Sequence, residues 1–197
     1  DILHENEDKS DVRLNRFLSD AGFCSRREAD RLIEAGRVTV DGTKAELGTR
    51  VRPGQVVKVG SKVVRQNDRM VLIAFNKPRG IVCTTDRVRE KNNIIDYIHY
   101  PERIYPIGRL DKDSEGLILL TNDGTIVNHI LKASQYHEKE YIVTIDKPVT
   151  EHFLEQMAGG IRLSELDQVT RPCKVKKVER NTFSIILTQG LNRQIRR

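Results

Sequence analysis

The stretch RLNRFLSDAGFCSRREADRLIEAGRVTVDG, residues 13–42, decides the fold of the first part of the chain. Apolar residues recur every three or four positions over Leu14–Ala21, which predicts a short helix. The pattern Ser-Arg-Arg-Glu at Ser25–Glu28 is a capping box that opens a second helix, and Gly36 ends that helix. Val38–Gly42 has the pattern of a strand followed by a tight turn. The stretch therefore predicts a helix-turn-helix followed by a β-hairpin.

The solvent face of the second predicted helix is basic. It carries Arg26, Arg27 and Arg31, and the last two are four residues apart. They should project from one side of the helix, at a separation suited to successive phosphates of a nucleic acid. Asp30 and Glu34 lie on the same helix, so an ordinary solvated face of mixed charge is the alternative interpretation.

Charge is distributed unevenly along the 197 residues, whose formal net charge is +6. Residues 1–11 form an acidic tail with a net charge of −4, whereas residues 12–65 carry +6 and residues 66–197 carry +4. A basic segment of this length favours a module that binds a polyanion, joined to a second domain. Charge alone is equally compatible with a basic protein that binds no polyanion.

The composition argues against several classes of protein. The longest apolar runs, Met70–Phe75 and Leu117–Leu120, are far shorter than the roughly 20 residues that a membrane-spanning helix needs. Cys24, Cys83 and Cys173 are odd in number and widely spaced, which argues against a disulfide framework and favours a reducing cytosol. The histidines and cysteines show no metal-ligand spacing, and no nucleotide-cofactor motif occurs, so we expect neither a metal nor a cofactor.

The rest of the chain predicts an α+β domain. Residues 61–69 are polar and charged and are expected to be a linker. Strand-like runs follow with few helical segments and no repeating strand–helix period, which favours a mixed, mainly antiparallel sheet. The expected strands are Met70–Phe75, Ile81–Thr84, Leu117–Thr121, Tyr141–Ile145, Lys174–Val178 and Phe183–Thr188, and the expected helices are Asn93–His99, Thr125–Ala133 and Thr150–Met157.

One charged segment, GRLDKDSEGL at residues 108–117, leads directly into an apolar strand. It places three carboxylates and two cations at the foot of that strand, where the backbone is held rigidly. Asp111 lies between Arg109 and Lys112, whose charges would keep its carboxylate ionised, as a nucleophile or a base requires. A surface loop with local ion pairs explains the same residues, so the segment alone leaves both interpretations open.

Several longer motifs carry a resemblance to known families. Residues 13–42 resemble the small RNA-binding domain first seen in a ribosomal small-subunit protein. Four later motifs resemble, in order and spacing, those of RNA pseudouridine synthases of the branch that modifies ribosomal RNA: NKPRGIVCTTD (76–86), GRLDKDSEGLILLTNDG (108–124), HEKEYIV (137–143) and QGLNRQIRR (189–197). The resemblance implies an RNA-binding domain at 12–60 and a catalytic domain at 70–197. Because the chain stops inside the last motif, we expect the catalytic domain to be incomplete at its C-terminus.

The resemblance also implies roles for individual residues. Asp111 matches the catalytic aspartate, Tyr141 the tyrosine that stacks on the uracil, and Arg196 the arginine that pairs with the catalytic carboxylate. Arg109 matches the arginine that helps to evert the target base and fills the space it leaves, and Lys139 matches a motif lysine. The implied substrate-binding residues are Arg109, Lys139, Arg26, Arg27 and Arg31.

The activity that follows from the resemblance is isomerisation of uridine to pseudouridine in structured RNA, with large-subunit ribosomal RNA the favoured substrate and transfer RNA the alternative. This reaction breaks the glycosidic bond, turns the uracil and rejoins it through carbon 5, so it needs no cofactor. Asp111 could attack the sugar, attack the ring or act as a base. We expect a monomer with no membrane partner. The rival functions are a non-catalytic RNA-binding factor in ribosome assembly and a hydrolase that releases free uracil.

Overall fold

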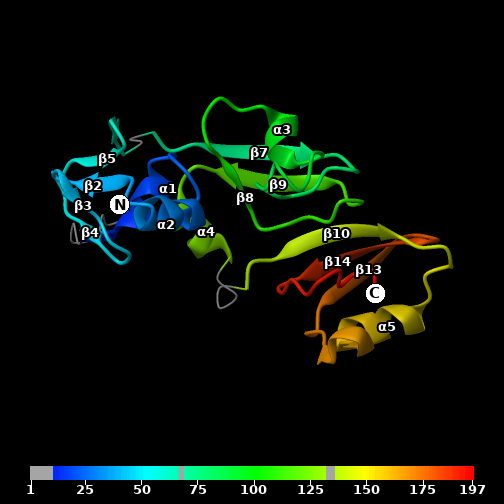
Figure 1. Ribbon diagram of the computed structural model, residues 1–197. Helices are drawn as coiled ribbons and strands as arrows, with labels where there is room; N and C mark the ends of the chain where they lie inside the picture. The colour runs from blue at the N-terminus through cyan, green and yellow to red at the C-terminus, as the bar shows by residue number, and fades with distance from the viewer. Residues whose placement is uncertain (1–10, 67–68, 132–135) are drawn as a thin grey trace, which may run out of the picture. The chain divides into compact units, whose positions relative to one another are not determined.

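The computed structural model describes residues 11–66, 69–131 and 136–197. The chain divides into two compact units, residues 1–127 and 128–197 (Figure 1). Apart from Asp11, the predicted acidic tail lies outside the described residues. None of the helices within these ranges is both long and apolar enough to cross a membrane.

Two helices open the first unit and match the prediction. They are α1 (Leu14–Asp20) and α2 (Arg26–Glu34). The Ser25 hydroxyl accepts a hydrogen bond from the Glu28 backbone N–H at 3.2 Å, as the capping-box pattern requires. Gly36 has a φ of +68°, a left-handed conformation that glycine adopts readily after a helix. Cap and stop residues therefore fix both ends of α2.

The cap of α2 should be measurable as stability. Ser25→Ala removes the hydroxyl that satisfies the Glu28 N–H, and we expect it to lower the free energy of unfolding by about 1 kcal/mol. Urea denaturation followed by circular dichroism measures the change. Ser25→Thr keeps an oxygen in the same position and is the matched control. An equal loss in both variants would show that the hydroxyl is not acting as a cap.

A four-stranded antiparallel sheet completes this N-terminal domain, here residues 12–66. Its strands lie in the order β3-β2-β5-β6, namely β2 (Val38–Val40), β3 (Thr43–Lys44), β5 (Val57–Val59) and β6 (Lys62–Val64). Asp41 and Gly42 form the predicted turn between β2 and β3, with φ values of +49° and +81°. A separate pair joins β1 (Val12–Arg13) to β4 (Arg50–Val51).

Strand β6 lies inside the segment that the sequence predicted to be a linker. Residues 62–64 pair with β5 across a turn at Gly60, and the Val64 side chain is buried in the domain core. The linker prediction is therefore wrong for these three residues. This strand is too short to show the alternation of apolar and polar residues, and charged residues surround Val63 and Val64, so the sequence pattern did not reveal it.

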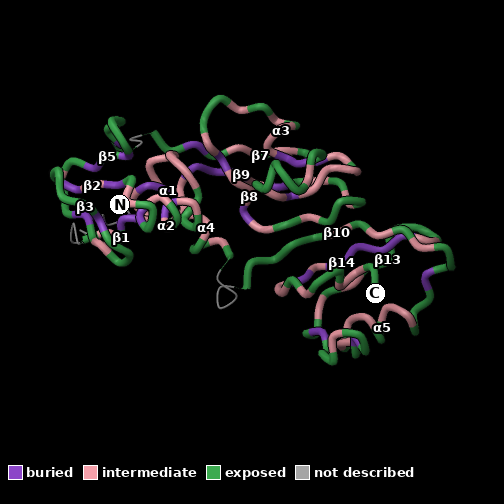
Figure 2. The backbone as a smooth tube through the Cα atoms, viewed as in Figure 1, coloured by how far each residue is buried: buried purple, intermediate pink, exposed green. Residues whose placement is uncertain are grey.

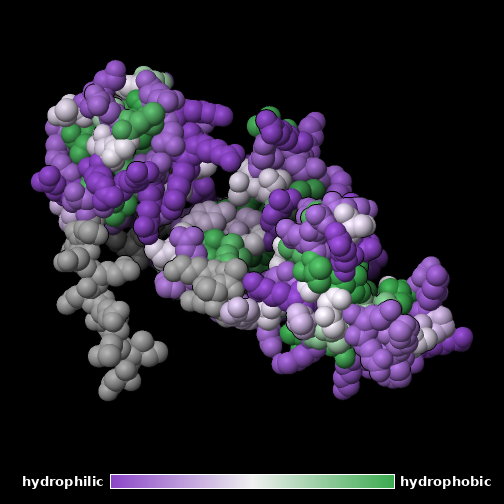
Figure 3. All heavy atoms as spheres, turned by 90° about the horizontal axis from the view of Figure 1, so that it is seen from below, coloured by the Kyte–Doolittle hydropathy of each residue, from purple (hydrophilic) through white to green (hydrophobic). Residues whose placement is uncertain are grey.

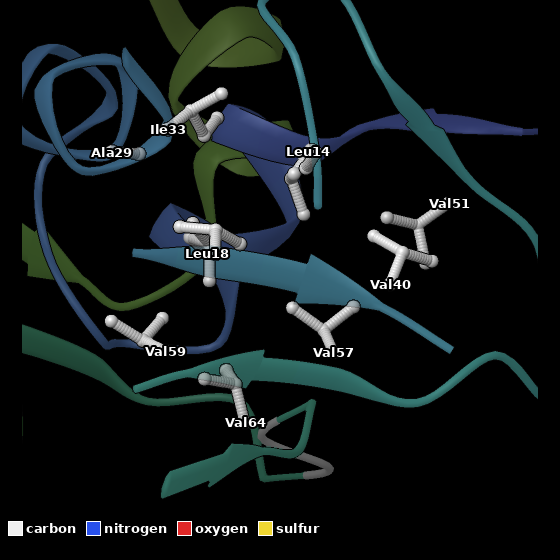
Figure 4. Close-up of a cluster of buried hydrophobic side chains, with 11 residues drawn as sticks. Leu14, Leu18, Ala29, Ile33, Val40, Val51, Val57, Val59 and Val64 are labelled. Atoms are coloured by element: carbon white, nitrogen blue, oxygen red, sulfur yellow. The ribbon is translucent and has the colours of Figure 1, made fainter. Parts of the chain in front are cut away.

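The core of the N-terminal domain joins the helices to the sheet (Figure 4). Leu14 and Leu18 from α1 and Ala29 and Ile33 from α2 are each at most 3% exposed. They pack against Ala45 and six valines of the strands: Val38, Val40, Val51, Val57, Val59 and Val64. Burying each valine side chain stabilises the fold by roughly 1.5–3 kcal/mol relative to exposure, so the valine pattern of the strands sets the packing of the domain.

A three-stranded antiparallel sheet forms the rest of the first unit. Its strands lie in the order β7-β9-β8, namely β7 (Leu72–Lys77), β8 (Tyr105–Ile107) and β9 (Gly116–Thr121). The helix α3 (Ile94–Ile98) is capped by Asn93, and α4 (Gly124–Leu131) follows β9. The predicted strand at Ile81–Thr84 is replaced by a single bridge from Val82 to Asn93, and β8 was not predicted.

The second unit is a three-stranded antiparallel sheet with a helix. The strands β10 (Lys139–Thr144), β14 (Thr182–Leu187) and β13 (Lys174–Glu179) lie in that order. The helix α5 (Glu151–Gly159) contributes Phe153, whose ring lies edge-on to Phe183 at 5.2 Å between centroids. Five of the six residues of β14 are buried, whereas the strands beside it are largely exposed (Figure 2).

Short elements connect α5 to β13. They are β11 (Arg162–Leu163), a 3₁₀ turn at Ser164–Leu166 and β12 (Gln168–Val169). In the described chain every pairing between named strands is antiparallel, which confirms the α+β prediction with an antiparallel arrangement. Hydrophilic side chains dominate the face shown in Figure 3, with hydrophobic ones in smaller groups.

All three cysteines are free, and each belongs to a different hydrophobic cluster. Cys24 packs against the core of the N-terminal domain, Cys83 is buried beneath the β7-β9-β8 sheet, and Cys173 packs against the core of the second unit. Burial raises the pKa of the Cys24 and Cys173 thiols. These thiols are therefore mostly protonated at neutral pH.

Candidate active site and RNA-binding face

The loop between β8 and β9, residues 108–115, carries Asp111. Asp111 and Arg109 are both exposed, as expected for groups that reach a substrate. The Ser114 N–H donates to the Asp111 carbonyl at 3.0 Å, which closes a turn after the aspartate. On the other side, the Leu110 N–H donates to the Cys83 Sγ at 3.4 Å. The backbone is therefore anchored on both sides of Asp111.

Lys77, the last residue of β7, is fully buried beneath this loop. Its Nζ donates hydrogen bonds to three backbone carbonyls: Pro78 at 2.7 Å, Ile81 at 2.8 Å and Lys112 at 3.3 Å. The Lys112 carbonyl also accepts a bond of 2.7 Å from the Gly80 N–H. The ammonium thus joins the turn after β7 to the residue that follows the candidate aspartate.

The buried charge of Lys77 is balanced by its surroundings. Burial lowers the pKa of the Lys77 ammonium, while the neighbouring Cys83, Asp113 and Asp111 side chains act in the opposite direction. An ammonium has three N–H donors, and three carbonyls accept from this one. Full hydrogen bonding offsets much of the cost of removing the charge from water.

The sequence analysis assigned no role to Lys77. The signal that could have identified it is a lysine that ends an apolar strand directly before a Pro-Arg-Gly turn. A lysine at a strand end is usually solvated, so only the fold shows that the turn encloses it.

Lys139 and Tyr141 lie on β10 in the second unit. They are two residues apart on one strand, so their side chains project from the same face. Tyr141 is half-buried, lies opposite Ile185 and packs against the core of the unit. The Lys139 Nζ donates to the His137 carbonyl at 3.1 Å. The structure brings these two predicted residues together at the start of β10.

Arg196 lies in the segment that follows β14, and it is exposed. Its N–H donates to the Arg193 carbonyl at 2.9 Å, and the neighbouring Ile195 packs against the core of the second unit. Arg197 forms an ion pair with Glu165. These contacts hold the last motif as a series of compact turns.

The predicted site residues are divided between the two units. Asp111 and Arg109 share one loop of the first unit, whereas Lys139, Tyr141 and Arg196 belong to the second unit. The pairing of Arg196 with the Asp111 carboxylate stays a prediction. In the described parts of the chain, no group of three or more His, Cys, Asp or Glu side chains is placed to hold a metal ion.

The basic residues of α2 lie where the sequence predicted. Arg26, Arg27 and Arg31 are all exposed on this helix. The Arg31 Nη1 lies 3.2 Å from the Glu28 Oε2, so one of the three cations has an acidic neighbour on its own helix. The helix also carries Glu28, Asp30 and Glu34, so its formal charges balance, and RNA binding by the three arginines stays a prediction.

Comparisons with known proteins agree with this arrangement. Residues 71–197 match the family model of RNA pseudouridylate synthase, and residues 12–57 match the model of the S4 domain. The second match covers β1, α1, α2, β2, β3 and β4, and it ends at the first residue of β5. The family resemblance inferred from the motifs is confirmed.

Individual relatives give the same result. The chain is 54% identical over 190 residues to the "Dual-specificity RNA pseudouridine synthase RluF" of Escherichia coli, an alignment that covers 95% of this chain and 64% of that protein. It is 33% identical to the "Ribosomal large subunit pseudouridine synthase B" of Bacillus subtilis, over 94% of this chain and 78% of that one. A crystal structure of a pseudouridylate synthase superposes with a TM-score of 0.64 at 26% identity, covering 93% of this chain and 80% of that chain. The chain therefore belongs to the RNA pseudouridine synthase family.

Proposed function

We propose that the protein converts uridine to pseudouridine at selected sites in structured RNA. The observation that carries this proposal is the loop of Asp111, which presents an exposed carboxylate on a backbone anchored by Lys77 and Cys83. A carboxylate that acts on one atom of a bound nucleotide must be held in a fixed position. Family membership supplies the reaction class for that carboxylate.

The other predicted residues supply the steps that the reaction needs. A target uridine must leave its base stack, which costs a few kcal/mol, and the Arg109 side chain would fill the space it leaves. The Tyr141 ring would stack on the everted uracil, which recovers roughly 1–3 kcal/mol. Arg196 would pair with the Asp111 carboxylate and orient it towards the nucleotide.

We propose large-subunit ribosomal RNA as the substrate and the basic face of α2 as the surface that first holds it. The Bacillus subtilis relative is named for the large ribosomal subunit, while the Escherichia coli relative is named dual-specificity. Lys and Arg contacts to phosphates position a protein on RNA without reading its sequence. Substrate choice therefore depends on the shape of the RNA presented to the loop of Asp111.

The reaction can be tested with RNA that carries tritium at carbon 5 of uracil. We expect release of the label into water with no free uracil, because carbon 5 loses its hydrogen when it joins the sugar. Free uracil among the products would identify a hydrolase. If a folded protein binds the RNA but releases no label from any cellular RNA, the enzyme proposal is wrong and the non-catalytic binding factor is correct.

The α2 face makes a separate prediction about affinity. Arg27→Ala is expected to weaken RNA binding and to reduce the slope of log affinity against log salt by about one, because one phosphate contact is lost. Turnover at saturating RNA should stay unchanged. Lys58→Ala removes an exposed cation from β5 of the same domain and serves as the control. Equal slopes for the two variants would indicate that total charge, rather than the α2 face, binds the RNA.

A further inference from the structure

Three segments meet at one end of the sheet in the second unit. Both β10 and β13 run antiparallel to β14. The first residues of β10 and β13 therefore lie at the same end of the sheet as the last residues of β14. The register places Lys139 opposite Leu187 and Lys174 opposite Ile186. Residues just before β10 and β13 therefore lie on either side of the segment that follows β14.

At this end, a tyrosine and an arginine contact each other across the end of β14. The guanidinium carbon of Arg171 lies 5.1 Å from the centroid of the Tyr136 ring. The backbone N–H of Arg171 donates a hydrogen bond to the Gln189 Oε1 at 2.5 Å, so the arginine also contacts the segment after β14. The two residues precede the two outer strands, β10 and β13. Outer strands of a three-stranded sheet lie about 9.5 Å apart, so the side chains reach across the end of the central strand.

Tyr136 has two features that a simple packing contact does not require. The residue is 58% exposed although its ring already carries a cation on one side. Its φ is +48°, in the left-handed region, which is uncommon for a bulky residue and costs free energy. An aromatic ring held in a strained position, covered on one side and open to solvent elsewhere, is an available stacking surface.

The surroundings of the ring are basic. Lys139 begins β10, Lys174 begins β13, and both are exposed. Lys174 lies 3.2 Å from Glu138, while Lys176 is exposed farther along the edge strand β13. An exposed aromatic ring among cations is the arrangement by which proteins hold single-stranded nucleic acid, with bases stacked and phosphates neutralised.

We propose that Tyr136 and Arg171 form a stacking platform for one unpaired nucleotide of the RNA substrate. The platform lies just before the strand that carries Tyr141, so it would hold a nucleotide other than the target uridine. This inference rests on the proposed function, since RNA is its ligand. Stacking is tolerant of sequence because every base has an aromatic face, so the platform selects unpaired RNA over duplex.

The chain contains no tryptophan, which makes a direct test possible. Tyr136→Trp introduces a single indole at the platform, and base stacking quenches indole emission. The RNA probes are a short hairpin with a uridine-rich, single-stranded loop and a blunt duplex with the same stem. We expect the hairpin to quench the emission of Tyr136→Trp strongly and the duplex to leave it nearly unchanged.

Tyr97→Trp is the matched control, because Tyr97 is 56% exposed and lies on α3 in the first unit. Its emission should not respond to the hairpin. In a second measurement, Tyr136→Leu should weaken hairpin binding by roughly 5- to 150-fold, while Tyr136→Phe should bind like the parent protein. Unfolding in urea is compared for all variants. Tyr136→Trp keeps a ring beside Arg171, so its result stands even if Tyr136→Leu fails to fold.

Two outcomes would overturn the platform. One is unchanged emission of Tyr136→Trp while the hairpin binds normally, and the other is unchanged hairpin affinity in a folded Tyr136→Leu. Either result would show that the contact only closes the end of the sheet. The proposed function is tested separately by tritium release from labelled RNA. That measurement does not depend on the indole emission of Tyr136→Trp.

Discussion

Asp111→Asn is expected to lower the rate of pseudouridine formation by about 10⁴-fold or more. The amide has almost the same shape as the carboxylate, so the loop and its bonds to Cys83 and Lys77 should be retained. The amide oxygen is neither a nucleophile nor a base of useful strength, so only the chemical step is lost. RNA affinity and the free energy of unfolding should stay close to those of the parent protein.

Tritium release under single-turnover conditions measures this effect. Asp113→Asn is the matched control, since it removes an equal charge from the same loop two residues away. We expect that variant to retain most of the activity. A similar loss in both variants would mean that the charge of the loop matters rather than Asp111 itself. An Asp111→Asn protein within tenfold of the parent rate would exclude the aspartate from the reaction.

Lys77→Met is expected to lower the free energy of unfolding by about 3 kcal/mol. The Pro78 and Ile81 carbonyls lose the ammonium donor, while the Lys112 carbonyl keeps the Gly80 N–H. Each unsatisfied carbonyl costs roughly 1–3 kcal/mol, and burial of the methionine side chain recovers only part of this. The same change frees the Lys112 carbonyl beside Asp111 from the ammonium. We therefore expect the turnover of the folded variant to fall by about 100-fold, because small displacements of a catalytic group are costly.

Urea denaturation and tritium release measure the two effects of Lys77→Met. Lys91→Met is the control, because it removes one lysine charge at an exposed position. The control should unfold and react like the parent protein. If Lys77→Met matches the control in both measurements, the buried ammonium neither stabilises the fold nor positions the loop.

The elements that the sequence predicted well are those fixed by local chemistry. The capping box at Ser25 and the left-handed Gly36 define α2 without help from distant residues. The turn at Asp41 and Gly42 likewise carries its own conformational preference. Strand β9 was predicted because its apolar run is long enough to stand out from its charged neighbours.

Strand β8 and the segment at Ile81–Thr84, which differ from the prediction, depend on partners in other segments of the chain. Strand β8 is only Tyr-Pro-Ile and forms because β9 lies beside it, with its proline on an edge strand. The run at Ile81–Thr84 has the composition of a strand, but its Val82 N–H and carbonyl bond to the Asn92 carbonyl and the Ile94 N–H. Such choices depend on the tertiary fold and leave little trace in a local window.

In the candidate site too, some residues could be predicted from local sequence and others depend on the tertiary fold. Residue spacing alone left Asp111 as either a catalytic group or a surface acid. The resemblance to the family motifs favours the catalytic role, which stays a prediction. Lys77 could not be predicted because its burial requires the Lys112 carbonyl, 35 residues away. The Tyr136–Arg171 contact was also invisible in the sequence, since it joins residues on opposite sides of β14.

The distribution of the cysteines gives each core its own chemical reporter. Thiol-alkylating reagents react with the thiolate, so the buried Cys83 reacts only after the surrounding side chains have moved apart. The half-buried Cys24 and Cys173 react faster when the side chains around them move. Cys24, Cys83 and Cys173 each belong to a different cluster, so their separate labelling rates follow the opening of three parts of one unmodified protein. Mass spectrometry of labelled peptides would then give the labelling rate of each cysteine. Comparing these rates with and without RNA would show which of the three cores RNA binding stabilises.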